Sequence, residues 1–247
     1  MPNILKFLLL IVFTLVSIRG FSEIKKDTIN PIKVSGSIQL ANNGISPVPA
    51  FSLGKPAIMT AFSIKKGNLS FNPQFNYGID GRPWSSNNWL RLQFPKKKFT
   101  FRAGINWSLF FKQATVTENN QTFVIKRVNR YLETELAAFY QISDKITLQT
   151  MWWHDEGMDV DAVKRGSFYS LSATISKIPL SKSLKMTLIP HVFYLHNKIP
   201  FEGFFASAMA IFSYKNSPFT LSAQAVKPIW VKPESQFNWN IGLNWGF

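Results

Sequence analysis

The last eleven residues of the chain, residues 237–247, have the sequence FNWNIGLNWGF. Apolar side chains occupy the odd positions of this segment, and asparagine or glycine occupies the even positions. Because successive side chains of a β-strand point to opposite faces, this alternation predicts a strand with one apolar and one polar face. Such a strand belongs either to a soluble β-sandwich, in which the apolar face meets another sheet, or to a membrane barrel, in which it meets lipid.

The composition is compatible with a membrane barrel. Hydrophobic residues make up 46% of the 247 residues, and the mean hydropathy is close to zero. A near-zero average is typical of barrels too, because lipid-facing and lumen-facing residues alternate and cancel. The aromatic content of 15% exceeds what a globular core requires and suits aromatic girdles at two membrane interfaces. The absence of cysteine excludes disulfides, thiolate metal sites and cysteine nucleophiles.

The N-terminus predicts export. Lys6 precedes an apolar run over residues 7–18, and small residues follow at Gly20 and Ser22. This order predicts a cleaved signal peptide over residues 1–22, followed by a periplasmic segment over residues 23–31. The alternative, a single anchoring helix, requires about 20 apolar residues. The net charge of +15 indicates an anionic partner, and export favours lipid phosphates or acidic solutes over nucleic acid.

Alternating segments recur along the rest of the chain, with turn-forming residues between them. The clearest cover residues 69–78, 99–111, 132–142, 146–153, 184–194, 219–226 and 237–247, and weaker ones cover 32–41, 58–65, 89–94, 168–177 and 204–214. The connections alternate between short ones and long ones, and the long ones are 42–56, 79–88, 112–129, 154–166, 197–203 and 227–236. We therefore predict an all-β fold, an antiparallel transmembrane β-barrel of about 12 strands over residues 32–247, with short periplasmic turns and longer extracellular loops.

The end of the chain resembles a known class. A final alternating strand that finishes in an aromatic residue, as Trp245, Gly246 and Phe247 do here, is similar to the Gram-negative outer-membrane β-barrels. The resemblance implies an outer-membrane location and recognition of the strand by the barrel assembly machinery, with Trp245 and Phe247 as the assembly signal. The Lys-, Asn- and Phe-rich composition also resembles proteins of the Bacteroidetes. The resemblance identifies a class and no specific functional family.

Assigning the more apolar face to lipid predicts which side chains line the lumen. Most are uncharged serine, threonine, asparagine and glutamine. A lumen charge cluster is expected from residues on neighbouring strands, namely Arg91, Arg102, Glu133 and Glu135, with Lys33, Lys185 and His191 as further lumen candidates. Opposite charges on adjacent strands are expected to pair. The cluster is interpreted either as a selectivity filter that attracts anions or as a structural network that fills the bore.

Basic and aromatic residues predict the membrane boundaries. Basic residues at strand tops and in long loops are expected to contact lipopolysaccharide and other outer-membrane lipids, among them Arg82, Lys112, Lys126, Arg127, Arg130, Lys198, Lys227 and Lys232. Tryptophans near the same end are expected to form an aromatic girdle, namely Trp84, Trp89, Trp107, Trp152, Trp153 and Trp230. The loop residues Asp155, Glu156, Asp159 and Asp161 do not have EF-hand spacing and are expected to be solvated, so no metal and no cofactor is predicted.

Three functions remain open. The leading hypothesis is a narrow, porin-like passive channel for small polar or anionic solutes, favoured by a continuous water path. The second is a non-conducting barrel that acts as a subunit or scaffold with an envelope protein partner, favoured by a plugged bore. The third, least favoured, is an outer-leaflet lipid-modifying enzyme, which requires a histidine, a serine and an acid clustered at the outer leaflet. The chain has three histidines, at 154, 191 and 196, and Ser170 is the nearest expected nucleophile, but it is predicted to point inward.

Overall fold

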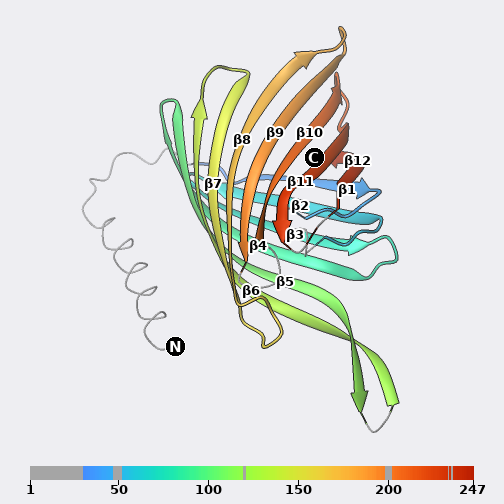
Figure 1. Cartoon of the computed structure of the whole chain (residues 1–247). Coiled ribbons are helices and arrows are strands. Elements are labelled where there is room, and N and C mark those ends of the chain that lie inside the picture. Colours follow the sequence, from blue (N-terminus) through green and yellow to red (C-terminus); the bar gives the residue numbers. More distant parts are fainter. Residues whose placement is uncertain (1–29, 47–51, 119–120, 198–201, 233, 235) are drawn as a thin grey trace, which may run out of the picture. The chain divides into compact units, whose positions relative to one another are not determined.

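The computed structural model describes residues 30–46, 52–118, 121–197, 202–232, 234 and 236–247. The predicted signal peptide and residues 23–29 lie outside this range, so their assignment stays a prediction. Every regular element of the described residues is a β-strand (Figure 1). The strands are β1 (Lys33–Ala41), β2 (Ala57–Lys66), β3 (Leu69–Gly78), β4 (Pro83–Lys96), β5 (Phe99–Glu118), β6 (Gln121–Gln141), β7 (Ile146–Gly157), β8 (Arg165–Pro179), β9 (Leu184–Asn197), β10 (Glu202–Tyr214), β11 (Phe219–Lys232) and β12 (Asn238–Gly246).

The strands form one closed antiparallel barrel in which each strand pairs with its sequence neighbours and β12 pairs with β1. The predicted fold class is therefore confirmed. Closure has a physical cause, because an open sheet edge in hydrocarbon leaves backbone N–H and C=O groups without partners. Among the residues that the structure describes, no helix has the length and apolar character needed to span a membrane.

The seam between β1 and β12 is completed by Phe247. Its backbone N–H donates to the Gly36 carbonyl over 3.0 Å, and the Gly36 N–H donates to the Phe247 carbonyl over 2.9 Å. The Phe247 ring lies over Gly36, so a Cβ atom at position 36 would lie 2.6 Å from the ring atom Cζ. Glycine at this position allows the last aromatic ring to pack against the closing strand.

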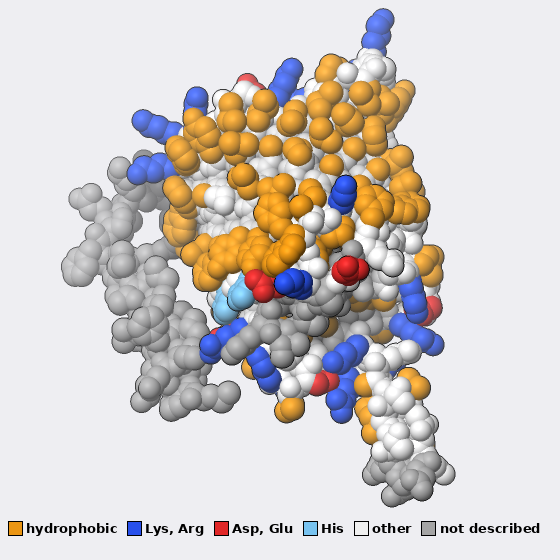
Figure 2. Space-filling view, in the orientation of Figure 1, with side chains coloured by type: hydrophobic (Ala, Val, Ile, Leu, Met, Phe, Trp, Pro, Cys, Tyr) orange, Lys and Arg blue, Asp and Glu red, His pale blue; other side chains and the backbone are white. Residues whose placement is uncertain are grey.

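The outer wall of the barrel carries the apolar side chains. In β12, Trp239, Ile241, Leu243 and Trp245 are exposed, whereas Asn240 on the opposite face is buried in the barrel. Figure 2 shows hydrophobic side chains spread over much of the visible outer surface. The alternation noted in the sequence therefore corresponds to a lipid-facing wall and a lumen-facing wall.

Several predicted loops are partly strand in the structure, and among them residues 227–232 of the predicted loop 227–236 belong to β11. The predicted loop 112–129 is a hairpin extension of β5 and β6, paired from Phe111↔Val128 to Glu118↔Gln121, and Figure 1 shows it projecting beyond the neighbouring strands. The predicted loop 79–88 shortens to residues 79–82, because β4 begins at Pro83. Residues 83–88 do not alternate in polarity, so the period-two pattern did not reveal this part of β4. Residues 113–117 do alternate, and their continuation of β5 was missed.

The loop end of the lumen contains an apolar cluster that was not predicted. Phe168, Phe193, Leu195, Phe205 and Val226 are buried there, and Ile45 from the β1–β2 connection packs against them. The expected aromatic girdle was also wrong in part, because Trp84 and Trp89 are buried at 6% and 5% exposure. Adjacent aromatic residues such as Trp152–Trp153 point to opposite faces of a strand, and composition does not tell which of them faces lipid.

Candidate functional site

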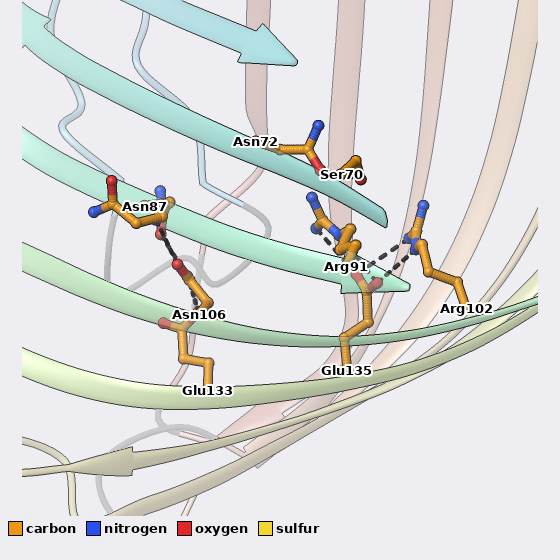
Figure 3. Close-up of polar contacts among 9 residues, drawn as sticks. Ser70, Asn72, Asn87, Arg91, Arg102, Asn106, Glu133 and Glu135 are labelled. Atoms are coloured by element: carbon orange, nitrogen blue, oxygen red, sulfur yellow. Dashed lines mark hydrogen bonds and ion pairs between the residues drawn. The ribbon is translucent and has the colours of Figure 1, made fainter. Parts of the chain in front are cut away.

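An ion-pair group crosses three adjacent strands inside the barrel. Arg91 from β4 and Arg102 from β5 both bind Glu135 from β6, each through two hydrogen bonds to the carboxylate (Figure 3). Arg91 donates from Nε and Nη2 over 3.1 Å each, and Arg102 donates from Nε over 2.5 Å and from Nη2 over 3.1 Å. The sequence predicted that these residues would pair, and the structure brings these three together.

Gly104 makes this arrangement possible. It lies between Arg91 and Glu135 in the strand register, paired with each of them. A Cβ atom at position 104 would lie 3.0 Å from Cγ of Arg91 and 3.3 Å from Cε3 of Trp89. Without a side chain at this position, Arg91 reaches across β5 to the carboxylate on β6. This role was not predicted, although a glycine inside a strand signals close approach of another group.

Aromatic rings hold both guanidinium groups in place. Cζ of Arg91 lies 4.3 Å from the centre of the Trp89 ring, and Cζ of Arg102 lies 4.8 Å from that of Phe139. Such cation–π contacts favour a fixed side-chain conformation. Both arginine side chains remain 17% exposed, whereas Glu135 is 3% exposed. The cationic groups therefore face the open part of the lumen, and the carboxylate lies behind them.

Glu133 was predicted to belong to the same cluster, but it forms a separate network. Its carboxylate accepts from Nδ2 of Asn106 over 2.5 Å and from Oγ of Ser108 over 2.6 Å. Asn106 Nδ2 also donates to the Asn87 side chain over 3.2 Å. Figure 3 shows this group apart from the arginines, and Glu133 is 1% exposed. Glu133 points to the inside of the barrel, as Glu135 does, but its carboxylate is covered and braces the wall.

The other predicted lumen residues do not join the ion-pair group. Lys33 and Lys185 lie near the ends of β1 and β9 at the short-turn end of the barrel and are exposed. His191 does lie in the lumen, where its ring contacts Phe168 and Phe193 and its Nδ1 lies 3.3 Å from Ser207 Oγ. Trp245 and Phe247 have the positions described for the seam, which does not test their role as an assembly signal.

Two cavities inside the barrel meet at the arginines. One, of about 470 Å³, extends toward the long-loop end and is lined in part by Ile45, Trp84, Trp89 and Trp153. The other, of about 510 Å³, extends toward the short-turn end and is lined mainly by polar residues, namely Ser35, Ser37, Ser63, Lys65, Ser70, Asn72, Gln74 and Gln93. Arg91 and Arg102 line both cavities. Any solute that moves from one cavity to the other passes these two cations.

The acidic loop after β7 is held by basic residues of the β5–β6 hairpin. Arg130 Nη2 lies 2.6 Å from Asp159 Oδ1, and Asp161 contacts Lys112 over 3.0 Å and Arg127 over 3.1 Å. The hydrogen bonds from Arg130 lower the pKa of Asp159, and those from Lys112 and Arg127 lower the pKa of Asp161. The expectation of simply solvated carboxylates was therefore wrong for these two residues. They fasten the loop to the base of the hairpin.

Comparison with known proteins supports the fold. No protein-family model matches the chain. No curated protein matches it either. Among solved structures, the KdgM porin matches with a TM-score of 0.56 at 8% identity, covering 86% of this chain and 99% of that one. The KdgM porin in complex with disordered oligogalacturonate matches with a TM-score of 0.52 at 7% identity, covering 87% and 98%.

A third solved structure agrees. The COG4313 outer membrane channel from Pseudomonas putida F1 matches with a TM-score of 0.51 at 9% identity, covering 91% of this chain and 99% of that one. At such identities the likeness concerns the fold. The closed barrel, its apolar outer wall and these outer-membrane fold relatives agree that the chain is an outer-membrane β-barrel.

Proposed function

We propose that the protein is a passive outer-membrane channel for small polar solutes, with a preference for anions set by Arg91 and Arg102. The observation that carries the proposal is the position of the two arginines, which line both lumen cavities at their junction. A solute in transit therefore meets the two guanidinium groups wherever it enters the barrel.

The charge balance at the junction favours anions. Two guanidinium groups and one carboxylate leave a net charge of +1, and the carboxylate is the more deeply buried partner. A charge within a low-dielectric wall attracts counter-ions more strongly than the same charge on an open surface. The serine, asparagine and glutamine side chains of the short-turn cavity provide hydrogen-bond partners for a polar solute but no further negative charge.

The geometry limits the solute to a small one. Each cavity holds about 500 Å³, and the long-loop cavity is bordered by three tryptophans. Basic residues that line the cavities are Arg91, Arg102 and Lys65. Three cations favour a single small anion over a long acidic polymer, which needs cationic partners along its whole length.

A second candidate function is a non-conducting barrel that serves as a subunit or scaffold of an envelope complex. The apolar cluster at the loop end favours it, because Phe168, Phe193 and Phe205 occupy space inside the barrel that a wide channel leaves to water. Both candidates share the fold and differ in whether ions cross it.

Ion conduction distinguishes the two. The protein is reconstituted in a planar bilayer, and the reversal potential is measured in a potassium chloride gradient. The triple variant Arg91→Gln/Arg102→Gln/Glu135→Gln removes the net +1 without leaving a buried charge unpaired, which would itself destabilise the barrel. Arg82→Gln is the matched control, because Arg82 is exposed and pairs with Asp80 outside the lumen.

We expect anion-selective conductance from the unmodified protein and the control, and weak selectivity from the triple variant. Absence of conductance, from protein whose fold is established by heat-dependent gel mobility, contradicts the channel and supports the scaffold. Equal selectivity of the triple variant and the unmodified protein contradicts the role of the arginines.

A further inference from the structure

The outer wall of the barrel carries a row of polar side chains at the long-loop end of β7 to β10. His154 on β7 is paired with Ser167 on β8, Ser167 is paired with His196 on β9, and His196 is paired with Glu202 on β10. Side chains that are directly paired across neighbouring strands lie about 5 Å apart at their Cβ atoms. All four face outward, because their strand neighbours Phe168, Leu195 and Gly203 are buried inside.

Contacts within this row join a hydroxyl, an imidazole and a carboxylate. Oγ of Ser167 lies 3.1 Å from Nδ1 of His154, within hydrogen-bonding distance. On the other side of the same ring, Nε2 lies 3.9 Å from Oε1 of Glu156. A proton on Nε2, facing the carboxylate, leaves the lone pair of Nδ1 free to accept the serine proton. This order, serine to histidine to acid, is the arrangement that activates a serine as a nucleophile.

A groove of about 730 Å³ begins next to this row and crosses the outward face of the barrel. Its lining is almost entirely apolar and includes Trp152, Tyr169, Tyr194 and Phe204, each two residues from a member of the polar row. Two residues along a strand correspond to about 7 Å. Trp152 stacks on His154 with ring centres 6.0 Å apart, so the polar row and the groove form one continuous surface.

The position of this surface matches the chemistry of a lipid ester. Figure 2 shows histidine side chains at the edge of the hydrophobic surface, beside acidic and basic side chains. In a membrane lipid, the ester group lies at the boundary between the apolar chains and the water-exposed headgroup. An acyl chain in the groove therefore places its ester carbonyl near the polar row.

We propose that the outer wall carries an acyl-ester hydrolase site, in which Ser167 is the nucleophile, His154 the general base and the groove the acyl-chain subsite. The substrate class is a long-chain acyl ester of an outer-leaflet lipid. Glu156 is a positioning residue that acts through His154. The reacting side chains of this site face away from the lumen, where Arg91 and Arg102 bind Glu135, and of these two arginines only Arg102 also borders the groove.

The reaction balances without a cofactor. The Ser167 hydroxyl proton passes to Nδ1 of His154 while Oγ forms a bond to the ester carbonyl carbon. The bond from that carbon to the alcohol oxygen then breaks, and the alcohol leaves with the proton from His154. Water next attacks the acyl-serine, His154 takes the water proton and returns it to Oγ, and a fatty acid is released. No atom changes oxidation state.

Arg165 supplies positive charge beside the nucleophile. It is two residues before Ser167 on the same outward face, and its Nε lies 3.6 Å from Oε1 of Glu156. A guanidinium in this place stabilises a developing oxyanion or binds the phosphate of a lipid headgroup.

The chain offers matched controls for each member of the site. Ser172 is on the same strand, is paired with His191 inside the barrel and does not line the groove. His191 also lies inside the barrel, against Phe193. Ser172→Ala and His191→Gln therefore change the same residue types on the other face of the wall.

The first test uses a fluorophosphonate with a long alkyl chain as the probe, added to the folded protein in detergent. Serine attack on phosphorus displaces fluoride and leaves a stable covalent adduct, which mass spectrometry locates. We expect an adduct on Ser167, a loss of labelling of at least tenfold in Ser167→Ala and His154→Ala, and unchanged labelling in Ser172→Ala and His191→Gln. Absence of an adduct on the folded protein, or equal labelling of Ser167→Ala, overturns the proposal.

The second test measures turnover of p-nitrophenyl esters of four and sixteen carbons. A groove that binds the acyl chain predicts a lower KM for the longer ester. Glu156→Gln keeps the shape of the side chain but removes its charge, so we expect kcat to fall at least tenfold with little change in KM. A change in KM alone contradicts the positioning role of Glu156, and equal KM values for the two esters contradict the groove as the chain subsite.

The lipid source is decided by product analysis. The protein is incubated with phosphatidylethanolamine vesicles in one arm and with vesicles that contain lipopolysaccharide in the other. Release of fatty acid in one arm, absent from Ser167→Ala, identifies the substrate class. Release in neither arm, from protein that is labelled by the fluorophosphonate, contradicts a lipid ester as the substrate.

Discussion

Glu135→Gln is the most informative single change in the lumen, because Glu135 alone neutralises one of the two arginines at the cavity junction. The glutamine has the same shape, but its amide nitrogen now faces guanidinium donors. Of the four hydrogen bonds that Arg91 and Arg102 donate to the carboxylate, those to the new nitrogen are lost. The net charge of the group changes from +1 to +2.

Two magnitudes follow. Removing one partner of a buried ion pair costs several kcal/mol, so we expect the free energy of unfolding to fall by about 3 kcal/mol. An added charge acts on a passing anion with about 1 kcal/mol at 4 Å in a water-like medium, and more in a lower dielectric. That energy corresponds to about a fivefold increase in anion occupancy.

Two assays check these magnitudes, with Asp144→Asn as the control. Asp144 is an exposed turn residue, and its substitution changes the net charge of the protein by the same amount as Glu135→Gln. Urea unfolding in lipid vesicles, followed by tryptophan fluorescence, measures the stability. The reversal potential in a planar bilayer measures the selectivity, and we expect a shift toward anions in Glu135→Gln only. A Glu135→Gln protein with unchanged stability and unchanged reversal potential refutes the reasoning that this carboxylate balances the junction.

Three further predictions concern the seam, the apolar cluster and the loop. Gly36→Ala places a methyl group against the Phe247 ring, so we expect about 1–3 kcal/mol of destabilisation and a lower yield of heat-resistant folded protein; a normal yield contradicts close packing at the seam. Phe205→Ala removes a ring that is 1% exposed, so we expect a loss of about 3–5 kcal/mol in urea unfolding, and an unchanged midpoint argues against the cluster as a core. Pairing with Arg130 lowers the pKa of Asp159, so this pair stabilises the folded protein fully above the ordinary carboxyl pKa of about 3.9. That stability is lost as the pH falls through the lower pKa of the folded state. NMR titration of the Asp159 carboxyl is therefore expected to give a midpoint below about 3.9.

The architecture could be predicted because the membrane imposes it on the sequence. Alternation over residues 237–247, and its recurrence at regular intervals, is a direct consequence of a wall with lipid on one side and water on the other. Strand ends outside the membrane were not predictable in the same way. In the β5–β6 hairpin beyond Phe111, the β6 arm over residues 122–126 has the sequence TFVIK, which does not alternate.

The candidate site was predictable only in part. Opposite charges on neighbouring strands indicated that Arg91, Arg102 and Glu135 would pair, and they do. The assignment of Glu133 to that group was wrong, because the register places it beside Asn106 and Ser108, whose hydrogen bonds satisfy its carboxylate. Glu133 and Glu135 are only two residues apart on β6, yet Glu135 belongs to the ion-pair group and Glu133 to the network with Asn106 and Ser108.

The sequence alone determined that the chain forms a closed barrel with an apolar outer wall, because strand periodicity and the need to pair every backbone group in lipid act on each segment locally. The tertiary structure decided which residues meet across strands, because register depends on how all twelve strands close into one ring. Arg91 and Glu135 are 44 residues apart in the chain, and His154 and Ser167 are 13 residues apart. Only the register of β4 to β6 and of β7 to β9 brings these side chains into contact.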